Sequence, residues 1–214
     1  MYQAQVFAPR KYAANRDAPY NVAGKDGIHP GWAGHVMMAY AFLNAMGIDG
    51  EVAKIEIDLE GQTAQVSDGH ELNSVKENQL TLTSSRYPYC AEGPIDDHNS
   101  IRSGMTLVPF HEELNRFTLK VSGLKTARAT VTWGDQSAEF DAETLADGIN
   151  LAKEFPVNPF SAAFKKVDVA VAAKQEYETH QIKSVFHGKE GQADIEAAVK
   201  RTEAERKPLA DAIR

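Results

Sequence analysis

Cysteine is almost absent from this chain of 214 residues, and its one occurrence, Cys90, excludes an internal disulfide. A lone thiol fits a reducing compartment and does not exclude an oxidising one. Cys90 stands beside Pro88 and Tyr89, and free cysteines are usually buried. We therefore predict that Cys90 is a small packed residue and that it does not act as a nucleophile.

Long apolar runs and an excess of basic residues are also lacking. No stretch approaches the roughly 20 apolar residues of a membrane span, and the formal net charge is -7. This charge argues against nucleic-acid partners and against docking on an anionic membrane. Residues 1–10 show no basic start followed by an apolar run, so no signal peptide is predicted. The compartment stays open, because a full-length parent protein could be secreted or periplasmic.

The composition that remains is typical of a globular protein, with 43% hydrophobic and 25% charged residues. The length suits one large domain, or one and a half of ordinary size. It also allows a hydrophobic core of useful size. We find no internal repeat and no low-complexity tract.

Apolar periodicity divides the first two-thirds of the chain into a helix and a series of strands. Helical spacing runs through residues 31–47, and Gly47 is well placed to end that helix. Alternation typical of strands precedes the helix at residues 3–7. It follows the helix at residues 52–59, 63–66, 80–84, 116–121, 127–133 and 138–140. A turn signal at Gly61 separates the strands at 52–59 and 63–66, and one at Gly134-Asp135 separates those at 127–133 and 138–140. We interpret residues 49–140 as a small antiparallel, sandwich-like region.

Helical spacing returns at Asp141, which is a good cap for a helix because Thr144 lies three residues later. Further helices are expected at residues 160–181 and 194–214, with a hinge at 188–191. The order of elements therefore predicts an α+β fold with three regions. They comprise residues 1–48, an antiparallel β region at 49–140, and a helical region at 141–214.

The sequence Asp26-Gly27-Ile28-His29-Pro30 carries the clearest chemistry. Two intervening residues let a tight turn bring the two side chains together, and Gly27 permits unusual backbone angles there. A carboxylate bonded to Nδ1 of a histidine selects the tautomer whose Nε2 accepts a proton, and it stabilises the imidazolium that forms. Asp26 and His29 are therefore candidates for the acid and the base of a triad that activates a hydroxyl nucleophile.

The longer string from Asp26 through Gly31, Gly34 and His35 to Ala39 resembles the last motif block of the SGNH/GDSL superfamily of esterases and lipases. The resemblance implies catalytic roles for Asp26 and His29 just before the final helix of a flavodoxin-like domain. It implies that residues 1–48 are the C-terminal remnant of such a domain. Residues beyond 50 look like the C-terminal extension of some bacterial members. The implied reaction is acyl transfer from a small ester or an acetylated carbohydrate, with no cofactor.

The nucleophile block that this family places near the start of its domain has no counterpart here. The closest string, Gly134-Asp135-Gln136-Ser137, has an extra residue and lies after the histidine, and we interpret Ser137 as a turn residue. A Gly-x-Ser-x-Gly elbow is also lacking. We expect the chain to be the C-terminal part of a longer hydrolase, inactive alone, whose N-terminal half or a partner chain supplies the serine.

The remaining polar clusters are weaker candidates, and no metal site is predicted. His35 is expected to pack or cap locally. Asp96, Asp97 and His98 are adjacent and point in different directions, which makes them poor joint metal ligands, so we expect a solvated acidic loop. Two other functions stay open. The strand region could be a β-sandwich binding module, and the C-terminal helices could contact a partner protein.

Overall fold

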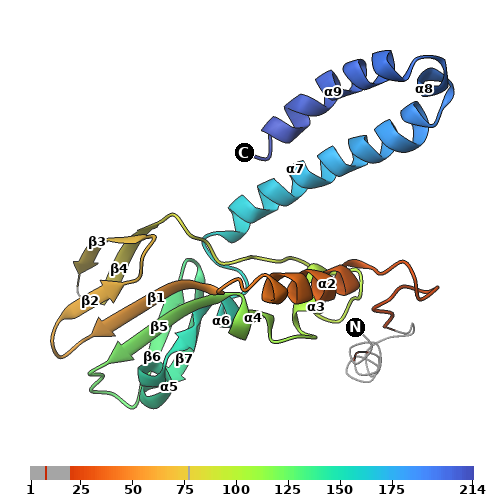
Figure 1. The fold of residues 1–214 in the computed structure, drawn as a ribbon. Helices are drawn as coiled ribbons and strands as arrows, with labels where there is room; N and C mark the ends of the chain where they lie inside the picture. The colour runs from red at the N-terminus through yellow and green to blue at the C-terminus, as the bar shows by residue number, and fades with distance from the viewer. Residues whose placement is uncertain (1–7, 9–19, 77) are drawn as a thin grey trace. The chain divides into compact units, whose positions relative to one another are not determined.

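The computed structural model describes residue 8, residues 20–76 and residues 78–214; the strand expected at residues 3–7 lies outside these. The fold is mixed α+β, with small sheets followed by C-terminal helices (Figure 1). The chain divides into two units, Met1–Phe160 and Ser161–Arg214, each with its own internal packing. The region boundaries proposed near residues 48 and 140 stay predictions.

Helix α2 (Trp32–Ala45) occupies the place that the periodicity predicts. It ends in a turn that satisfies its last carbonyls: the amide of Gly47, at φ +69°, donates to Asn44 O, and the amide of Ile48 donates to Leu43 O. This pattern is a Schellman motif, in which glycine adopts the left-handed conformation at low cost.

Eight strands and several short helices complete the described part of the first unit. The strands are β1 (Glu51–Asp58), β2 (Thr63–Val66), β3 (His70–Lys76), β4 (Gln79–Ser84), β5 (Arg116–Ser122), β6 (Arg128–Trp133), β7 (Gln136–Asp141) and β8 (Ile149–Asn150). The short helices are α3 (Ile101–Met105), α4 (Phe110–Glu113), α5 (Ala142–Asp147) and α6 (Leu151–Glu154). The predicted cap of α5 is confirmed, because Asp141 accepts the Thr144 amide at 2.8 Å.

The strands form a four-stranded sheet in the order β2-β1-β5-β8 and two separate hairpins, β3-β4 and β6-β7. The expectation of a purely antiparallel region is wrong at the centre of the main sheet, where β1 and β5 are parallel, with Ile55 opposite Leu119. Parallel neighbours need a long crossover, and residues 59–115 supply it. The other strand pairs are antiparallel.

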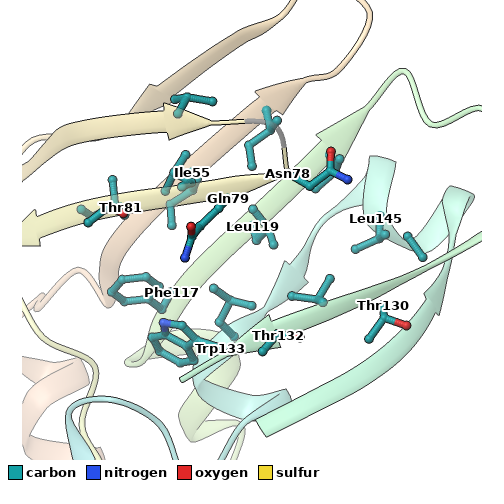
Figure 2. Close-up of a pocket in the computed structure, with 18 of the residues that line it drawn as sticks. Ile55, Asn78, Gln79, Thr81, Phe117, Leu119, Thr130, Thr132, Trp133 and Leu145 are labelled. Atoms are coloured by element: carbon teal, nitrogen blue, oxygen red, sulfur yellow. The ribbon is translucent and has the colours of Figure 1, made fainter. Parts of the chain in front are cut away.

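The two hairpins contribute side chains to the same space as β1 and β5, and together they line a partly open cavity of about 580 Å³ (Figure 2). Side chains alternate across a strand, and β1 and β5 contribute every second residue to this space, whereas β4 and β6 also contribute neighbouring residues at its rim. The inward residues include Ile55, Ile57, Phe117, Leu119, Leu80, Leu82, Val131 and Trp133.

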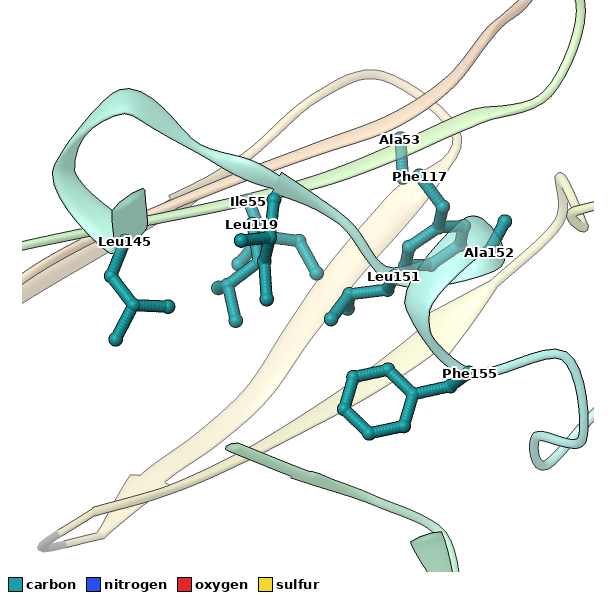
Figure 3. Packing of buried hydrophobic residues seen from close by; sticks show 9 residues of the cluster. Ala53, Ile55, Phe117, Leu119, Leu145, Leu151, Ala152 and Phe155 are labelled. Carbon is teal, nitrogen blue, oxygen red and sulfur yellow. The ribbon is translucent and has the colours of Figure 1, made fainter. Parts of the chain in front are cut away.

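The main hydrophobic core lies beside this cavity, between the sheet and the α5–α6 segment (Figure 3). Phe117 and Phe155 are 2% exposed and Leu145 is 1% exposed. Trp133 and Phe140 of the β6-β7 hairpin pack against the same cluster. Cys90 is buried as predicted.

Helix α2 packs against α3 through small residues. A Cβ added to Gly104 would lie 2.8 Å from Ala33 Cα, so the two helices approach closely there. The helix buries Ala33 and Val36 in this way, and its third buried residue, Gly34, lies against Val22 and Pro30. Its large apolar residues do not all follow: Trp32 is 51%, Phe42 69% and Met46 66% exposed. The sequence pattern correctly located the helix, and the apolar residues Trp32 and Met46 stay exposed on it.

The second unit is helical. It contains α7 (Ser161–His180), the π-helical segment η2 (Gln181–Phe186), α8 (Lys189–Ala193) and α9 (Ile195–Asp211). Side chains of α7 and η2 bond to α9: the Tyr177 hydroxyl donates to Glu205 at 2.6 Å, and Gln181 donates to the buried Thr202 hydroxyl at 2.9 Å. Among the described residues, no helix is long and apolar enough to cross a membrane.

Candidate active site

The turn before α2 brings Asp26 and His29 into contact. Asp26 Oδ2 lies 2.6 Å from His29 Nδ1, and Asp26 Oδ1 accepts the backbone amides of Ile28 and His29, each at 3.0 Å. Both carboxylate oxygens are therefore engaged within a few residues of chain. The spacing argument predicted this contact, and the geometry of the turn agrees with it.

Two glycines with positive φ shape this turn. Gly24 has φ +79° and Gly27 has φ +74°. A Cβ on Gly24 would lie 2.0 Å from the His29 carbonyl oxygen, so no side chain fits there. Gly27 meets nothing within 4 Å, and its role is conformational. The position of His29 relative to Asp26 is thus set by local backbone geometry.

The hydrogen bonds indicate which atoms of Asp26 and His29 carry a proton. The bond from the His29 side chain, followed by the amides of His29 and Ile28, holds the pKa of Asp26 far below its usual range. An ionised carboxylate only accepts hydrogen bonds, so Nδ1 of His29 must donate. In the neutral imidazole, Nε2 is then the atom that can take up a proton.

Exposure limits what this pair can do by itself. The side chain of His29 is 83% exposed and that of Asp26 is 51% exposed. A hydrogen bond in water is weaker than one in a closed site, and oxyanion stabilisation depends on donors in a water-excluded pocket. The turn therefore provides an oriented base without the surroundings in which such a base works efficiently.

The other predicted candidates lie in structural settings. His35 Nδ1 bonds to the Gly31 carbonyl at 2.9 Å, a local contact like the one expected. Ser137 lies in strand β7 and not in the turn as expected, and its Oγ lies 2.8 Å from Thr132 Oγ1 on the paired strand. In the part of the chain that the structure describes, no three His, Cys, Asp or Glu side chains gather as a metal site.

The Asp96–His98 loop is less solvated than expected. The His98 side chain is 16% exposed and its ring packs edge-on to Tyr20 at 5.7 Å. Its carbonyl accepts the Ala33 amide at 3.0 Å, which joins the loop to the first turn of α2. The loop supports the helix behind the Asp26–His29 turn, a long-range contact that the sequence pattern could not indicate.

No sequence pattern indicates the cavity between the main sheet and the two hairpins. Alternating apolar residues identified its strands one at a time. No local signal shows that these strands leave space between them, since that depends on how the strands are placed relative to one another. The residues around the cavity are the second candidate site of this chain.

Comparison with known proteins yields no family model and no curated protein that matches the chain. A solved structure described as a gut microbial diltiazem-metabolizing enzyme is similar, with 24% sequence identity and a TM-score of 0.65. The alignment covers 99% of this chain and 53% of that chain. The present chain thus spans about half the length of this structural neighbour. At this identity the likeness shows a shared fold.

Proposed function

We propose that this chain supplies the acid–base pair of an SGNH/GDSL-type ester hydrolase and corresponds to the C-terminal part of such an enzyme. The observation that carries the proposal is the Asp26–His29 contact, because it couples an ionised carboxylate to Nδ1 and leaves Nε2 as the base. The substrates would be small acyl esters or acetylated carbohydrates. The serine and the oxyanion donors would come from a segment or partner outside this sequence.

In this proposal His29 Nε2 removes the proton from the serine hydroxyl as its oxygen attacks the ester carbonyl. The imidazolium then gives the proton to the departing alcohol, and the acyl group stays on serine. In the second half-reaction His29 Nε2 removes a proton from water as the water oxygen attacks the carbonyl of the acyl-serine. The imidazolium then returns the proton to the serine oxygen, and the carboxylic acid is released. Asp26 remains ionised throughout, and it holds the ring and stabilises its positive form.

Exposed apolar side chains around the turn favour a site over which further protein packs. Ile28 is 75% exposed beside His29, and Trp32 and Phe42 are exposed on the helix that follows. Exposed apolar surface of this kind marks interaction sites in soluble proteins. Further protein packed over these side chains would exclude water from the Asp26–His29 pair and place a hydroxyl against it.

The structural neighbour offers limited support. Diltiazem is an ester-containing drug, so a fold shared with a diltiazem-metabolizing enzyme is compatible with ester chemistry. That chain is about twice as long as the aligned region, which is compatible with a catalytic half outside the present sequence.

The decisive experiment compares the chain alone with the protein encoded when the reading frame is extended upstream of Met1. We expect the chain alone to hydrolyse p-nitrophenyl acetate no faster than its His29→Ala variant. We expect the extended protein to contain a Gly-Asp-Ser block and to lose about 10³-fold or more of its turnover on His29→Ala. His35→Ala is the matched control and should change turnover by only a few-fold.

Two results would overturn the proposal. Turnover by the chain alone that depends on His29 would show that no further serine is required. An extended protein without a serine block, or with turnover indifferent to His29→Ala, would remove the basis for an esterase.

A further inference from the structure

The cavity of the first unit has the features of a small-molecule site, and it stands apart from the Asp26–His29 turn and from the proposed function. Its volume of about 580 Å³ falls within the range of ligand pockets, roughly 300–1,000 Å³. The walls come from residues of β1, β3, β4, β5 and β6, which belong to the main sheet and to both hairpins (Figure 2).

The wall residues are incompletely packed. Leu80, Leu82, Val121 and Val131 are only partly buried although they face the interior of the unit. Ile55 and Leu119, behind them, are buried at 4% and 8% exposure. Well-packed interiors leave few voids larger than a water molecule. The hollow therefore leaves apolar wall surface that a bound molecule would cover.

Charge restricts the occupant. None of the described residues that line the cavity has an ionisable side chain. A carboxylate, phosphate or ammonium placed there would lose hydration without an opposite charge, which is costly. The polar wall atoms are uncharged amides and hydroxyls, including those of Asn78, Gln79 and Thr81. The site therefore fits a neutral molecule with one or a few hydrogen-bonding atoms.

Aromatic side chains define another part of the wall. The rings of Phe117 and Trp133 lie 5.2 Å apart, and Phe160 lies 6.0 Å from Trp133. All three line the cavity. Figure 2 shows Phe117 and Trp133 together, away from Asn78. Offset and edge-to-face contacts with such rings favour a further aromatic ring over a flexible aliphatic chain.

We propose that this cavity binds a neutral small molecule that contains an aromatic ring. The ring lies against Phe117 and Trp133, and the aliphatic residues of β1, β4 and β5 cover the remainder. The amide side chains near the β3-β4 turn provide hydrogen bonds for its polar atoms. The apolar, uncharged wall disfavours a polysaccharide at this position.

The test uses two dyes that share one ring system. N-phenyl-1-naphthylamine is neutral, and 8-anilinonaphthalene-1-sulfonate adds a sulfonate to the same rings. We expect the neutral dye to bind saturably with one site per chain, and the anion to bind at least about tenfold more weakly because its charge would be buried. Equal or tighter binding of the anion would overturn the proposal.

Site specificity is tested by filling the cavity. Ala129 lines it on β6, whereas Ala127, two residues earlier, is exposed. Ala129→Phe should weaken binding of the neutral dye about tenfold or more, since the added ring occupies the site. Ala127→Phe should leave binding unchanged. Equal effects of the two variants, or no effect of either, would contradict the assignment.

Energy transfer provides a readout that does not depend on a folded cavity variant. The chain has two tryptophans, Trp32 and Trp133. In a Trp32→Phe protein, bound neutral dye should quench the emission of Trp133 as it saturates the site. Saturable binding without quenching of Trp133 would place the dye elsewhere and overturn the proposal.

Discussion

The turn and helix at residues 20–48 and the strand region at 51–160 solve different problems. In the first, a few residues of backbone orient two ionisable side chains, and large apolar residues such as Trp32 stay exposed. In the second, residues distant in sequence bury a core around Phe117 and line an uncharged cavity. A hydrogen-bonded Asp–His pair can therefore be built locally, whereas a buried core or a cavity requires long-range structure.

The largest expected effect is a difference in unfolding free energy between large-to-small substitutions in the two regions. Phe155 is 2% exposed in the strand region, so Phe155→Ala should lower the free energy of unfolding by about 3–5 kcal/mol. Trp32 is 51% exposed, and Trp32→Ala should cost below about 1.5 kcal/mol. Urea denaturation followed by circular dichroism measures both. Equal costs would show that α2 is packed as tightly as the strand core.

A second substitution tests how α2 is attached. The Cβ in Gly104→Ala would come within 2.8 Å of Ala33 Cα, and such overpacking should cost about 1–3 kcal/mol. Ala39→Leu adds bulk on the exposed side of α2 and should stay within about 0.5 kcal/mol. Thermal unfolding of the two variants checks this difference. A tolerant Gly104 would mean that α2 and α3 do not approach so closely.

The two regions also differ in how their helices begin. Asp141 caps α5 through the Thr144 amide, whereas α2 begins at Gly31 with no side-chain cap bond. Asp141→Ala should cost about 1 kcal/mol. The Thr144 amide bond also lowers the pKa of Asp141, so this stabilisation should be complete above the usual aspartate range and fade as the pH falls through the lower folded value. Asp147→Ala at the other end of α5 is the control, and an equal cost there would argue against capping.

The smallest expected effect is on the titration of the Asp26 carboxyl group in the turn before α2. His29 and two amides lower the pKa of Asp26 below its ordinary value of 3.8. The ionised pair should therefore be intact above that value and be lost only as the pH falls further. Carboxyl carbon chemical shifts should show this low midpoint, and His29→Ala should raise it toward the ordinary value. A midpoint that His29→Ala leaves unchanged would mean that the two side chains are not coupled.

The sequence predicts features that depend on neighbours along the chain. The Gly134-Asp135 turn, the Asp141 cap, the end of α2 at Gly47 and the Asp26–His29 contact all involve residues within a few positions of one another. Short-range geometry restricts each of them strongly, which is why a pattern of a few residues was sufficient.

Features that depend on distant partners were not predictable in this way. Strand β3 carries His70, Glu71 and Asn73 and lacks apolar alternation, yet it pairs with β4. The parallel contact of β1 with β5 joins segments on either side of a long crossover. The exposure of Trp32 and the cavity around Trp133 follow from how whole elements pack, and no local pattern contains that information.

The most direct test of the central claim is the tautomer of His29, measured by nitrogen-15 NMR on the neutral imidazole. If Asp26 orients the ring, the hydrogen resides on Nδ1 and Nε2 is free to accept a proton. Asp26→Ala should then shift the ring toward the Nε2–H form that is usual in water. An Nε2–H tautomer in the unmodified protein, unchanged by Asp26→Ala, would contradict the account.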